Sequence, residues 1–172
     1  MKKLCPATFL LPALVIGILM LSSCSGGGKN DFITLDSNNG NISLRLGMSE
    51  DEVRATINKD HVNDSASELQ AGIHFNWNSD RTQCLSFRDF GTYFITPTGL
   101  SVNNSAKADI LPAYAKDKDI KIIQNDDSRI VLGKQVDGVN YTLTFRFYPD
   151  GDVKYISVTN VDQYTEDEAD YP

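Results

Sequence analysis

Histidine, cysteine and tryptophan are scarce in this chain of 172 residues, which contains two, three and one of them respectively. His61 and His74 have no cysteine or further histidine at the short spacings that zinc sites require. The acidic runs at residues 126–127 and 166–168 do not follow the spacing of a calcium loop. We therefore expect the protein to bind no metal and no cofactor.

The sequence also lacks the short motifs that mark common active sites. No glycine-rich phosphate loop and no Gly-x-Ser-x-Gly turn follows a predicted strand. Acid–base catalysis needs only two carboxyl groups with different pKa values, so a pair such as Asp89 with Asp127 stays open as one choice among several. The sequence predicts a protein that is not an enzyme and has no catalytic residue.

The N-terminal segment contains the one long apolar run. Lys2 and Lys3 precede an apolar stretch at residues 9–21, and small residues follow it directly before Cys24. This order is typical of a secretion signal. The run is shorter than the roughly 20 residues that a transmembrane helix needs, and an uncleaved membrane anchor is the alternative interpretation.

The residues Leu-Ser-Ser-Cys at positions 21–24 resemble the lipobox of bacterial lipoproteins. In that family the signal peptide, here residues 1–23, is removed and the cysteine becomes the lipid-carrying first residue. The resemblance implies lipidation of Cys24 and a membrane anchor in the bacterial cell envelope, bordering the periplasm, with the outer membrane favoured over the inner. Two or three acyl chains would hold such a protein stably.

Charge and cysteine content narrow the partners of the remaining 149 residues. The signal carries two lysines and no acid, so its removal changes the formal net charge from −7 to −9. Such a charge disfavours binding to nucleic acid and to anionic lipid headgroups. Cys84 has no second cysteine to pair with besides Cys24, and we expect it to be half-buried on the strand face opposite Leu85 and Phe87.

The segment at residues 41–59 is predicted to be a strand, a tight turn and a short helix. Asn39-Gly40 favours a hairpin turn before the strand. Ser49 and Glu52 have the spacing of a capping box at the start of the helix. Val53 and Ile57 lie one turn apart and form the helix face that we expect to be buried.

A weaker copy of this pattern lies at residues 99–116. The corresponding positions are apolar in both copies: Leu44, Leu46 and Val53 in the first, and Leu100, Val102 and Ile110 in the second. Pro112 interrupts the second helix, so that this helix either starts near Asp109 or kinks.

We predict an α+β fold of two similar halves, each made of a strand, a short helix and an antiparallel meander, with the helices on one face of the sheet. A flexible tether at residues 24–30 precedes the first half at residues 31–97. The second half spans residues 98–160. An acidic tail at residues 161–172 has no pattern and is predicted to be a frayed end.

The sequence Gly-Met-Ser-Glu-Asp-Glu-Val at residues 47–53 resembles the start of the helix in small outer-membrane-assembly lipoproteins of the SmpA/OmlA type. The doubled arrangement is similar to the β-lactamase-inhibitor-protein-like fold. The resemblance covers most of residues 41–160 in pattern and about ten residues in motif. It implies a sheet with helices on one face and a strand surface that binds another protein, and it carries no catalytic residue over to this chain.

Four aromatic residues of the first half form a candidate binding surface: Trp77, Phe90, Tyr93 and Phe94. Aromatic side chains are common interface anchors, although they could instead fill the core under the sheet. We expect a non-catalytic protein-binding module whose partner is an envelope protein, with envelope assembly as one role. The alternatives are an envelope enzyme or small-ligand receptor with a carboxylate-lined cleft between the halves, and an inhibitor of a secreted hydrolase.

Overall fold

The computed structural model of this chain describes residues 31–38, 40–60 and 72–165. Within these residues the strands form two antiparallel sheets, and two α-helices accompany them. The prediction of an α+β fold is confirmed at this level. The predicted loop at residues 61–70 and the tether at residues 24–30 lie outside the described residues.

The smaller sheet has three strands in the order β2-β1-β5. A short 3-10 helix, η1 (Asp31–Ile33), leads into β1 (Thr34–Ser37), which pairs with β2 (Ser43–Arg45) and β5 (Phe94–Ile95). Between β1 and β2 the chain turns at Gly40, whose φ of 71° suits glycine. The hairpin predicted from Asn39-Gly40 is therefore present, with Asn39 itself outside the described residues.

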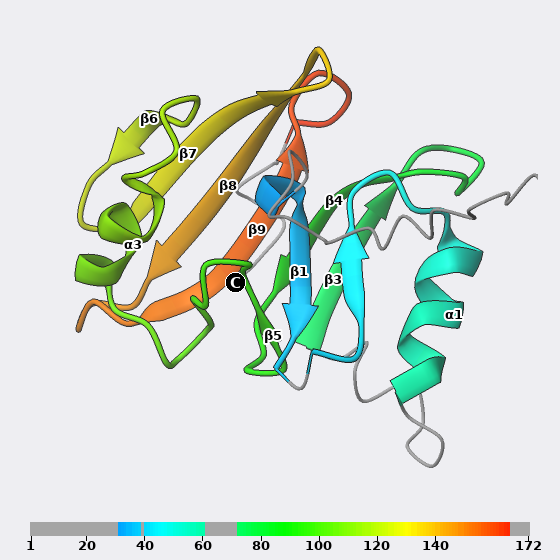
Figure 1. Cartoon of the computed structure of the whole chain (residues 1–172), viewed down its shortest axis with the longest axis horizontal. Helices are drawn as coiled ribbons and strands as arrows, with labels where there is room; N and C mark the ends of the chain where they lie inside the picture. The colour runs from blue at the N-terminus through cyan, green and yellow to red at the C-terminus, as the bar shows by residue number, and fades with distance from the viewer. Residues whose placement is uncertain (1–30, 39, 61–71, 166–172) are drawn as a thin grey trace, which may run out of the picture.

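The larger sheet has six strands in the order β3-β4-β9-β8-β7-β6 (Figure 1). Its first two strands are β3 (Ile73–Trp77) and β4 (Cys84–Asp89). The other four follow one another in the chain: β6 (Lys121–Asn125), β7 (Arg129–Val136), β8 (Val139–Phe147) and β9 (Val153–Asn160). Because β9 pairs with β4, strands from both parts of the chain belong to one sheet.

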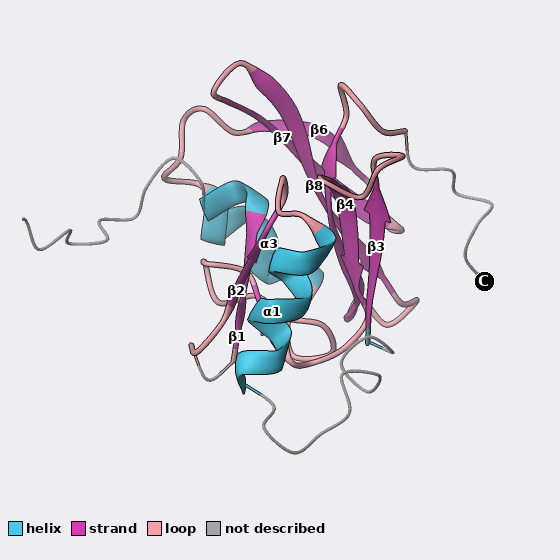
Figure 2. Ribbon diagram, turned by 90° about the vertical axis from the view of Figure 1, so that its right-hand side faces the viewer, coloured by secondary structure: helices cyan, strands magenta, loops and turns pink. Residues whose placement is uncertain are grey.

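Both helices lie on the same side of the larger sheet as the smaller sheet (Figure 2). They are α1 (Glu50–Asp60), as the capping pattern predicted, and α3 (Lys107–Tyr114). Of the two alternatives for the second helix, the start near Asp109 is not observed, because α3 begins at Lys107 and contains Pro112 beyond its first turn. Ile110 and Tyr114 are its buried residues.

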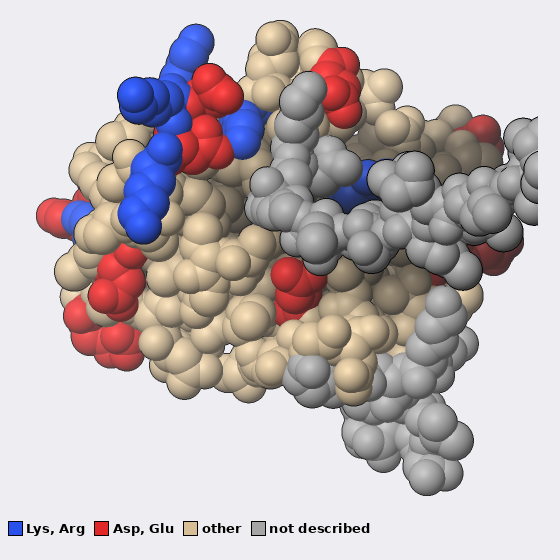
Figure 3. Space-filling view, viewed as in Figure 1, with Lys and Arg blue, Asp and Glu red and all other residues tan. Residues whose placement is uncertain are grey.

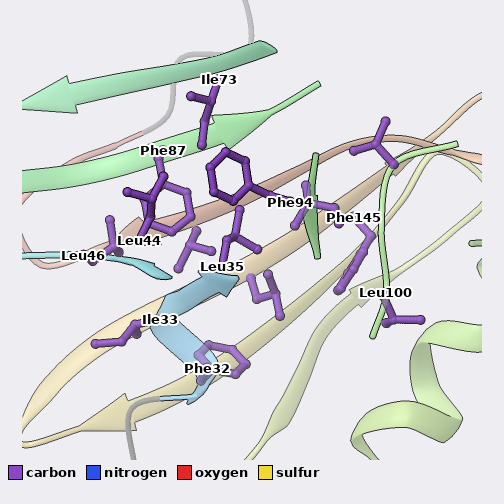
Figure 4. Packing of buried hydrophobic residues seen from close by; sticks show 14 of the residues in the cluster. Phe32, Ile33, Leu35, Leu44, Leu46, Ile73, Phe87, Phe94, Leu100 and Phe145 are labelled. Atoms are coloured by element: carbon purple, nitrogen blue, oxygen red, sulfur yellow. The ribbon is translucent and has the colours of Figure 1, made fainter. Parts of the chain in front are cut away.

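The core fills the space between the two sheets (Figure 4). Alternate residues of β8 point into it, among them Leu143 and Phe145, which face Val158 and Ile156 of β9. Leu35 of the smaller sheet is fully buried on the opposite side of the core. The strand alternation predicted from the sequence therefore decides which face of the larger sheet is apolar.

Cys84 lies in this core beside Phe87, and the prediction that the two residues occupy opposite strand faces is wrong. A β-bulge between β3 and β4 pairs Asn76 with Ser86 but Trp77 with Cys84, so one extra residue of β4 has no partner. The extra residue reverses the alternation. Burial raises the pKa of the Cys84 thiol to about 12, which leaves it protonated and unreactive.

The start of the acidic tail is held against the larger sheet. The Asp162 carboxylate accepts hydrogen bonds from the main-chain and side-chain nitrogens of Asn140, at 2.8 and 3.0 Å. These bonds hold the pKa of Asp162 below its usual range. The prediction of a frayed end is therefore wrong for residues 161–165, and residues 166–172 lie outside the described part of the chain.

The predicted repeat is not confirmed. In the first part of the chain a hairpin precedes α1, whereas in the second an isolated bridge between Ile95 and Ser101 replaces the expected strand before α3. The strands that follow the helices also differ, because three strands follow α1, one of them in the smaller sheet, whereas four follow α3, all in the larger sheet. Both parts contribute to a single core.

Replacing Val53 by Asp tests how far the fold depends on the buried face of α1. Val53 is 3% exposed, and Val53→Asp would bury an unpaired charge, which we expect to lower the free energy of unfolding by roughly 3 kcal/mol or more. Chemical denaturation measures the loss. Ala55→Asp places the same charge on the exposed side of the same helix and should cost much less; equal losses would contradict the packing described.

Candidate functional site

Residues of α1, of β3 and of the turn after β3 line a groove at the β3 edge of the larger sheet. We call it the α1–β3 groove. It has a volume of about 270 Å³. Its lining residues come from the helix, the strand and the turn that follows the strand: Glu50, Val53, Arg54, Ile73, His74, Phe75, Trp77 and Arg81.

The start of α1 is fixed by the capping box that the sequence predicted. The main-chain nitrogen of Ser49 donates to the Glu52 carboxylate at 2.8 Å, and the Glu52 nitrogen donates to the Ser49 hydroxyl at 3.3 Å. These bonds satisfy main-chain groups at the helix terminus that have no partner within the helix. The bonds that the Ser49 nitrogen and, at 3.0 Å, the Ser49 hydroxyl donate to the Glu52 carboxylate hold the pKa of Glu52 below its usual range.

The turn between β3 and β4 fastens the helix to the strand pair. Arg81 lies in this turn with φ at 58°, and its carbonyl accepts a hydrogen bond from the Glu50 nitrogen at 3.1 Å. The Arg81 guanidinium contacts both oxygens of the Glu50 carboxylate at 2.9 Å. Main chain and side chain of one residue thus set the spacing between the two walls of the groove.

The rim of the groove carries one net positive charge. Arg54 contacts the Glu50 carboxylate at 2.7 Å from the other side, so two guanidinium groups share one carboxylate. Hydrogen bonds from Arg54 and then from Arg81 hold the pKa of Glu50 below its usual range. The Glu50 carboxylate is therefore ionised at neutral pH, and Glu50, Arg54 and Arg81 together give this rim a formal net charge of +1.

The open wall of the groove is the edge of β3. Within the described residues this strand pairs only with β4. The Phe90 amide donates to the Gly72 carbonyl at 2.7 Å, which fixes the alternation of main-chain groups along the strand. The N–H and C=O groups of Ile73 and Phe75 consequently point away from β4, toward the open edge.

Trp77 continues this alternation past the β-bulge. The Asn78 amide donates to the Gln83 carbonyl at 3.0 Å, so the main chain of Trp77 also faces away from β4. Its ring packs against that of Phe75, with centroids 5.5 Å apart and an interplanar angle of 30°. The same alternate residues of β3 thus offer main-chain groups at the edge and apolar side chains to the groove.

The four aromatic residues predicted as one surface occupy three different places. Trp77 lines the groove, whereas Phe94 is 1% exposed and lies in the core, because β5 pairs with β1 in the smaller sheet, which packs against the larger one. Tyr93 packs edge-on against Phe94 at 5.0 Å. Phe90 lies on the outer face of the larger sheet, beside Tyr155 at 5.3 Å. Phe94 therefore does not belong to the predicted binding surface, since a side chain in the core offers no surface to a partner.

The carboxyl groups considered for catalysis do not meet. Asp127 is fully exposed in the turn between β6 and β7 and pairs with Lys107 at 3.0 Å. Asp89 ends β4, three strand positions away in the larger sheet, and its side chain is buried. Asp89 lines neither the α1–β3 groove nor the hollow beside β6 and β7.

Asp89 nevertheless differs from the other carboxyl groups of the described residues in being buried and in having a raised pKa. Its Oδ1 accepts a hydrogen bond from the Gly91 nitrogen at 3.0 Å, whereas its Oδ2 is buried and has no hydrogen-bond partner among the described residues. Burial raises the pKa of Asp89 to about 7, against the opposing effect of the Gly91 bond. Sequence inspection identified Asp89 only as one acid among many, because no local pattern reveals its burial.

Two further observations concern metals and membranes. The described residues contain no group of three or more side chains placed to ligate a metal ion. His61 lies outside these residues, and the ring of His74 packs against Phe90 with centroids 5.3 Å apart. None of the helices in the described part of the chain has the length and apolar character needed to cross a membrane.

Comparison with protein-family models, with curated proteins and with solved structures found no match to this chain. The arguments about its function therefore rest on the geometry of the molecule itself.

The burial of Asp89 predicts that stability falls as the pH rises. A folded-state pKa of about 7 lies above the unfolded value of about 4, so the folded chain binds the proton more tightly between these limits. The free energy of unfolding should decrease from pH 4 to pH 7, by roughly 4 kcal/mol at most. Denaturation at several pH values measures this slope.

Asp89→Asn should flatten this slope and make the protein more stable than the wild type at pH 8. The exposed acid Asp51 provides the control, because Asp51→Asn removes the same charge without changing the core. A slope that is unchanged in Asp89→Asn would contradict the assignment of the pH dependence to Asp89.

Proposed function

We propose that this chain is a non-catalytic protein-binding module of the cell envelope, which takes an extended segment of its partner as an added strand along β3. The observation that carries the proposal is the coincidence, at one edge, of two features: main-chain groups that pair with no other described strand, and a groove closed by α1 whose lining combines apolar side chains with a charged rim. Main-chain hydrogen bonds would provide affinity, and alternate side chains of the added segment would enter the groove and provide specificity.

The pinning of α1 supports this mode of binding. A groove whose two walls are joined by Glu50 and Arg81 keeps its width without a partner, so binding requires little reorganisation. Its floor includes Val53 and Ile73, which are buried in the free chain. The one net positive charge at the rim favours a segment that carries an acidic residue at that end.

The location in the cell envelope belongs to the same proposal. It rests on the resemblance of residues 21–24 to a lipobox, which implies a lipid on Cys24 and a signal peptide at residues 1–23. An anchor of this kind would hold the module beside envelope proteins, most favourably at the outer membrane, and the partner would be one of them.

The tandem organisation of the fold is also kept as a proposal, in a reduced form. The Ala106 nitrogen donates to the Asp109 carboxylate at 2.9 Å, as the Ser49 nitrogen does to Glu52 at the start of α1. Val53 and Ile110 are buried at matching positions of the two helices. Two units that share this helix start and have diverged elsewhere would account for both features.

The alternative of an enzyme with a carboxylate-lined cleft has less support. Glu50 is the single acid lining the α1–β3 groove, and Asp119 is the single acid lining the hollow beside β6 and β7, among the described residues. Asp89, whose pKa is raised, lines neither. The alternative of a hydrolase inhibitor shares the binding mode proposed here and differs only in the partner.

Site-specific photocrosslinking in cells tests the binding site. A photoreactive residue replacing Arg54, exposed at the groove rim, should give one discrete adduct with an envelope protein. The same residue replacing Asp150, exposed in the turn between β8 and β9, should give none. No adduct at position 54, or the same adduct from both positions, would overturn the proposal.

A pair of matched aromatic variants separates binding from folding. Trp77 and Tyr93 are both half-buried and pack against the core, but only Trp77 lines the groove. Trp77→Ala should remove most of the adduct formed from position 54, whereas Tyr93→Ala should retain it. Equal losses in the two variants would attribute the effect to packing instead of to binding.

The lipid anchor has its own test. Cys24→Ala should lose incorporation of labelled fatty acid and should move from the detergent phase to the aqueous phase on phase separation, because the acyl chains supply the membrane affinity. Mass spectrometry of the wild-type N-terminus checks the removal of residues 1–23. A variant that stays with the membrane would favour an uncleaved anchor.

A further inference from the structure

The opposite edge of the larger sheet has a different character from the β3 edge. Its end strand, β6, pairs within the described residues only with β7. Ile122 and Ile123 of this strand are 57% and 61% exposed, more than any other large apolar side chain of the described residues. A strand edge of this kind is a template for pairing with a further strand.

The main chain of β6 is also open at this edge. The Asp126 amide donates to the Arg129 carbonyl at 3.0 Å, so the N–H and C=O of Asn125 point away from β7. A β-bulge between Ile122 and Gln124 turns Ile123 over Gly133, whose missing side chain leaves room for it. The two isoleucines therefore flank the edge and do not cover it.

Charge is distributed unequally along this strand. Lys118 and Lys121 lie at its start with Asp119 between them, and neither lysine forms an ion pair within the described residues, so this end keeps one net positive charge. Asp126 and Asp127 follow its end, and hydrogen bonds from Ser128 and Gln124 hold the pKa of Asp126 far below its usual range. In Figure 3 the basic side chains gather at the end of the molecule where Figure 1 places the edge strand β6.

A strand with a basic start, an apolar middle and an acidic end is complementary to itself when it is reversed. We propose that β6 pairs antiparallel with β6 of a second copy about a two-fold axis, so that the lysine end of each copy faces the aspartate end of the other. The pairing would join the two larger sheets into one. It would also use the same surface on both copies, and so close without growing further.

The charges at the two ends of β6 favour a second copy of this chain, and not a lipid surface, as the partner of this edge. The acidic end of β6 would repel anionic headgroups, and the chain as a whole carries a net charge of −7. Main-chain groups of an open edge are also costly in a lipid environment, whereas a second strand pairs with them. Lys121 would disfavour the pairing of β6 with an unrelated strand, because an edge lysine must be accommodated by the added strand. In the reversed pairing it would instead attract Asp127 of the second copy.

Charge exchange tests the proposal with the chain from residue 24 onward carrying Cys24→Ala, a form that keeps every described residue. Sedimentation over a concentration series should show a monomer–dimer equilibrium for this form. Lys121→Glu and Asp127→Lys should each weaken it at least about tenfold, because each places like charges together at both ends of the pair. An equimolar mixture of the two variants should restore dimers.

The mixture distinguishes pairing from a loss of folding. In a mixed dimer the new carboxylate of the Lys121→Glu variant would face the new ammonium group of the Asp127→Lys variant. At the other end of the pair, the unchanged Lys121 of one copy would face the unchanged Asp127 of the other. Circular dichroism melts of each variant check that both remain folded. Restored dimers in the mixture, absent from either variant alone, would support the reversed pairing.

Three outcomes would overturn the proposal. The first is a chain that stays monomeric at every concentration and does not bind vesicles. The second is a chain that stays monomeric but floats with vesicles containing anionic lipid. The third is a dimer that neither charge reversal weakens. None of them bears on the α1–β3 groove, since β3 and β6 are at opposite edges of the sheet.

Discussion

The packing of one apolar sheet face against a second layer governs this structure. The inner face of the larger sheet, with Phe87 and Phe145 near its centre, is covered by the smaller sheet and both helices. Burial of this face supplies the main stabilisation that a domain of this size has available. β3 and β6 are the end strands of this sheet, so within the described residues each has one edge with no neighbouring strand, and the two edges have different surroundings.

Those surroundings give the two edges different chemical character. Beside β3, α1 is pinned by Glu50 and Arg81 and forms a second wall, so the edge becomes a groove with apolar side chains. No helix residue of the described part of the chain lines the hollow beside β6. At that edge the exposed Ile122 and Ile123 lie between lysines at the start of β6 and aspartates after its end. Under the two proposals made above, one sheet would bind a different protein at its β3 edge and a second copy of this chain at its β6 edge.

The sequence predicted local features well wherever a short pattern decides them. The capping box at Ser49 and the alternation of Ile73, Phe75 and Trp77 are of this kind, and both hold in the structure. Pairings distant in the chain were not predictable: the bulge that turns Cys84 inward, and the burial of Phe94 and Asp89, depend on which strands become neighbours. The groove itself was missed because the Glu50 and Arg81 contact joins residues that no local spacing relates.

Amide hydrogen exchange along β3 tests the strand-addition account most directly, with the partner segment identified from the crosslinked adduct as the ligand. In the free chain the amides of Ile73, Phe75 and Trp77 should exchange fast, and those of His74 and Asn76, which face β4, should exchange slowly. Adding the segment should slow the three fast amides and leave the other two unchanged. Protection confined to other strands, or no alternation along β3 in the free chain, would contradict the account.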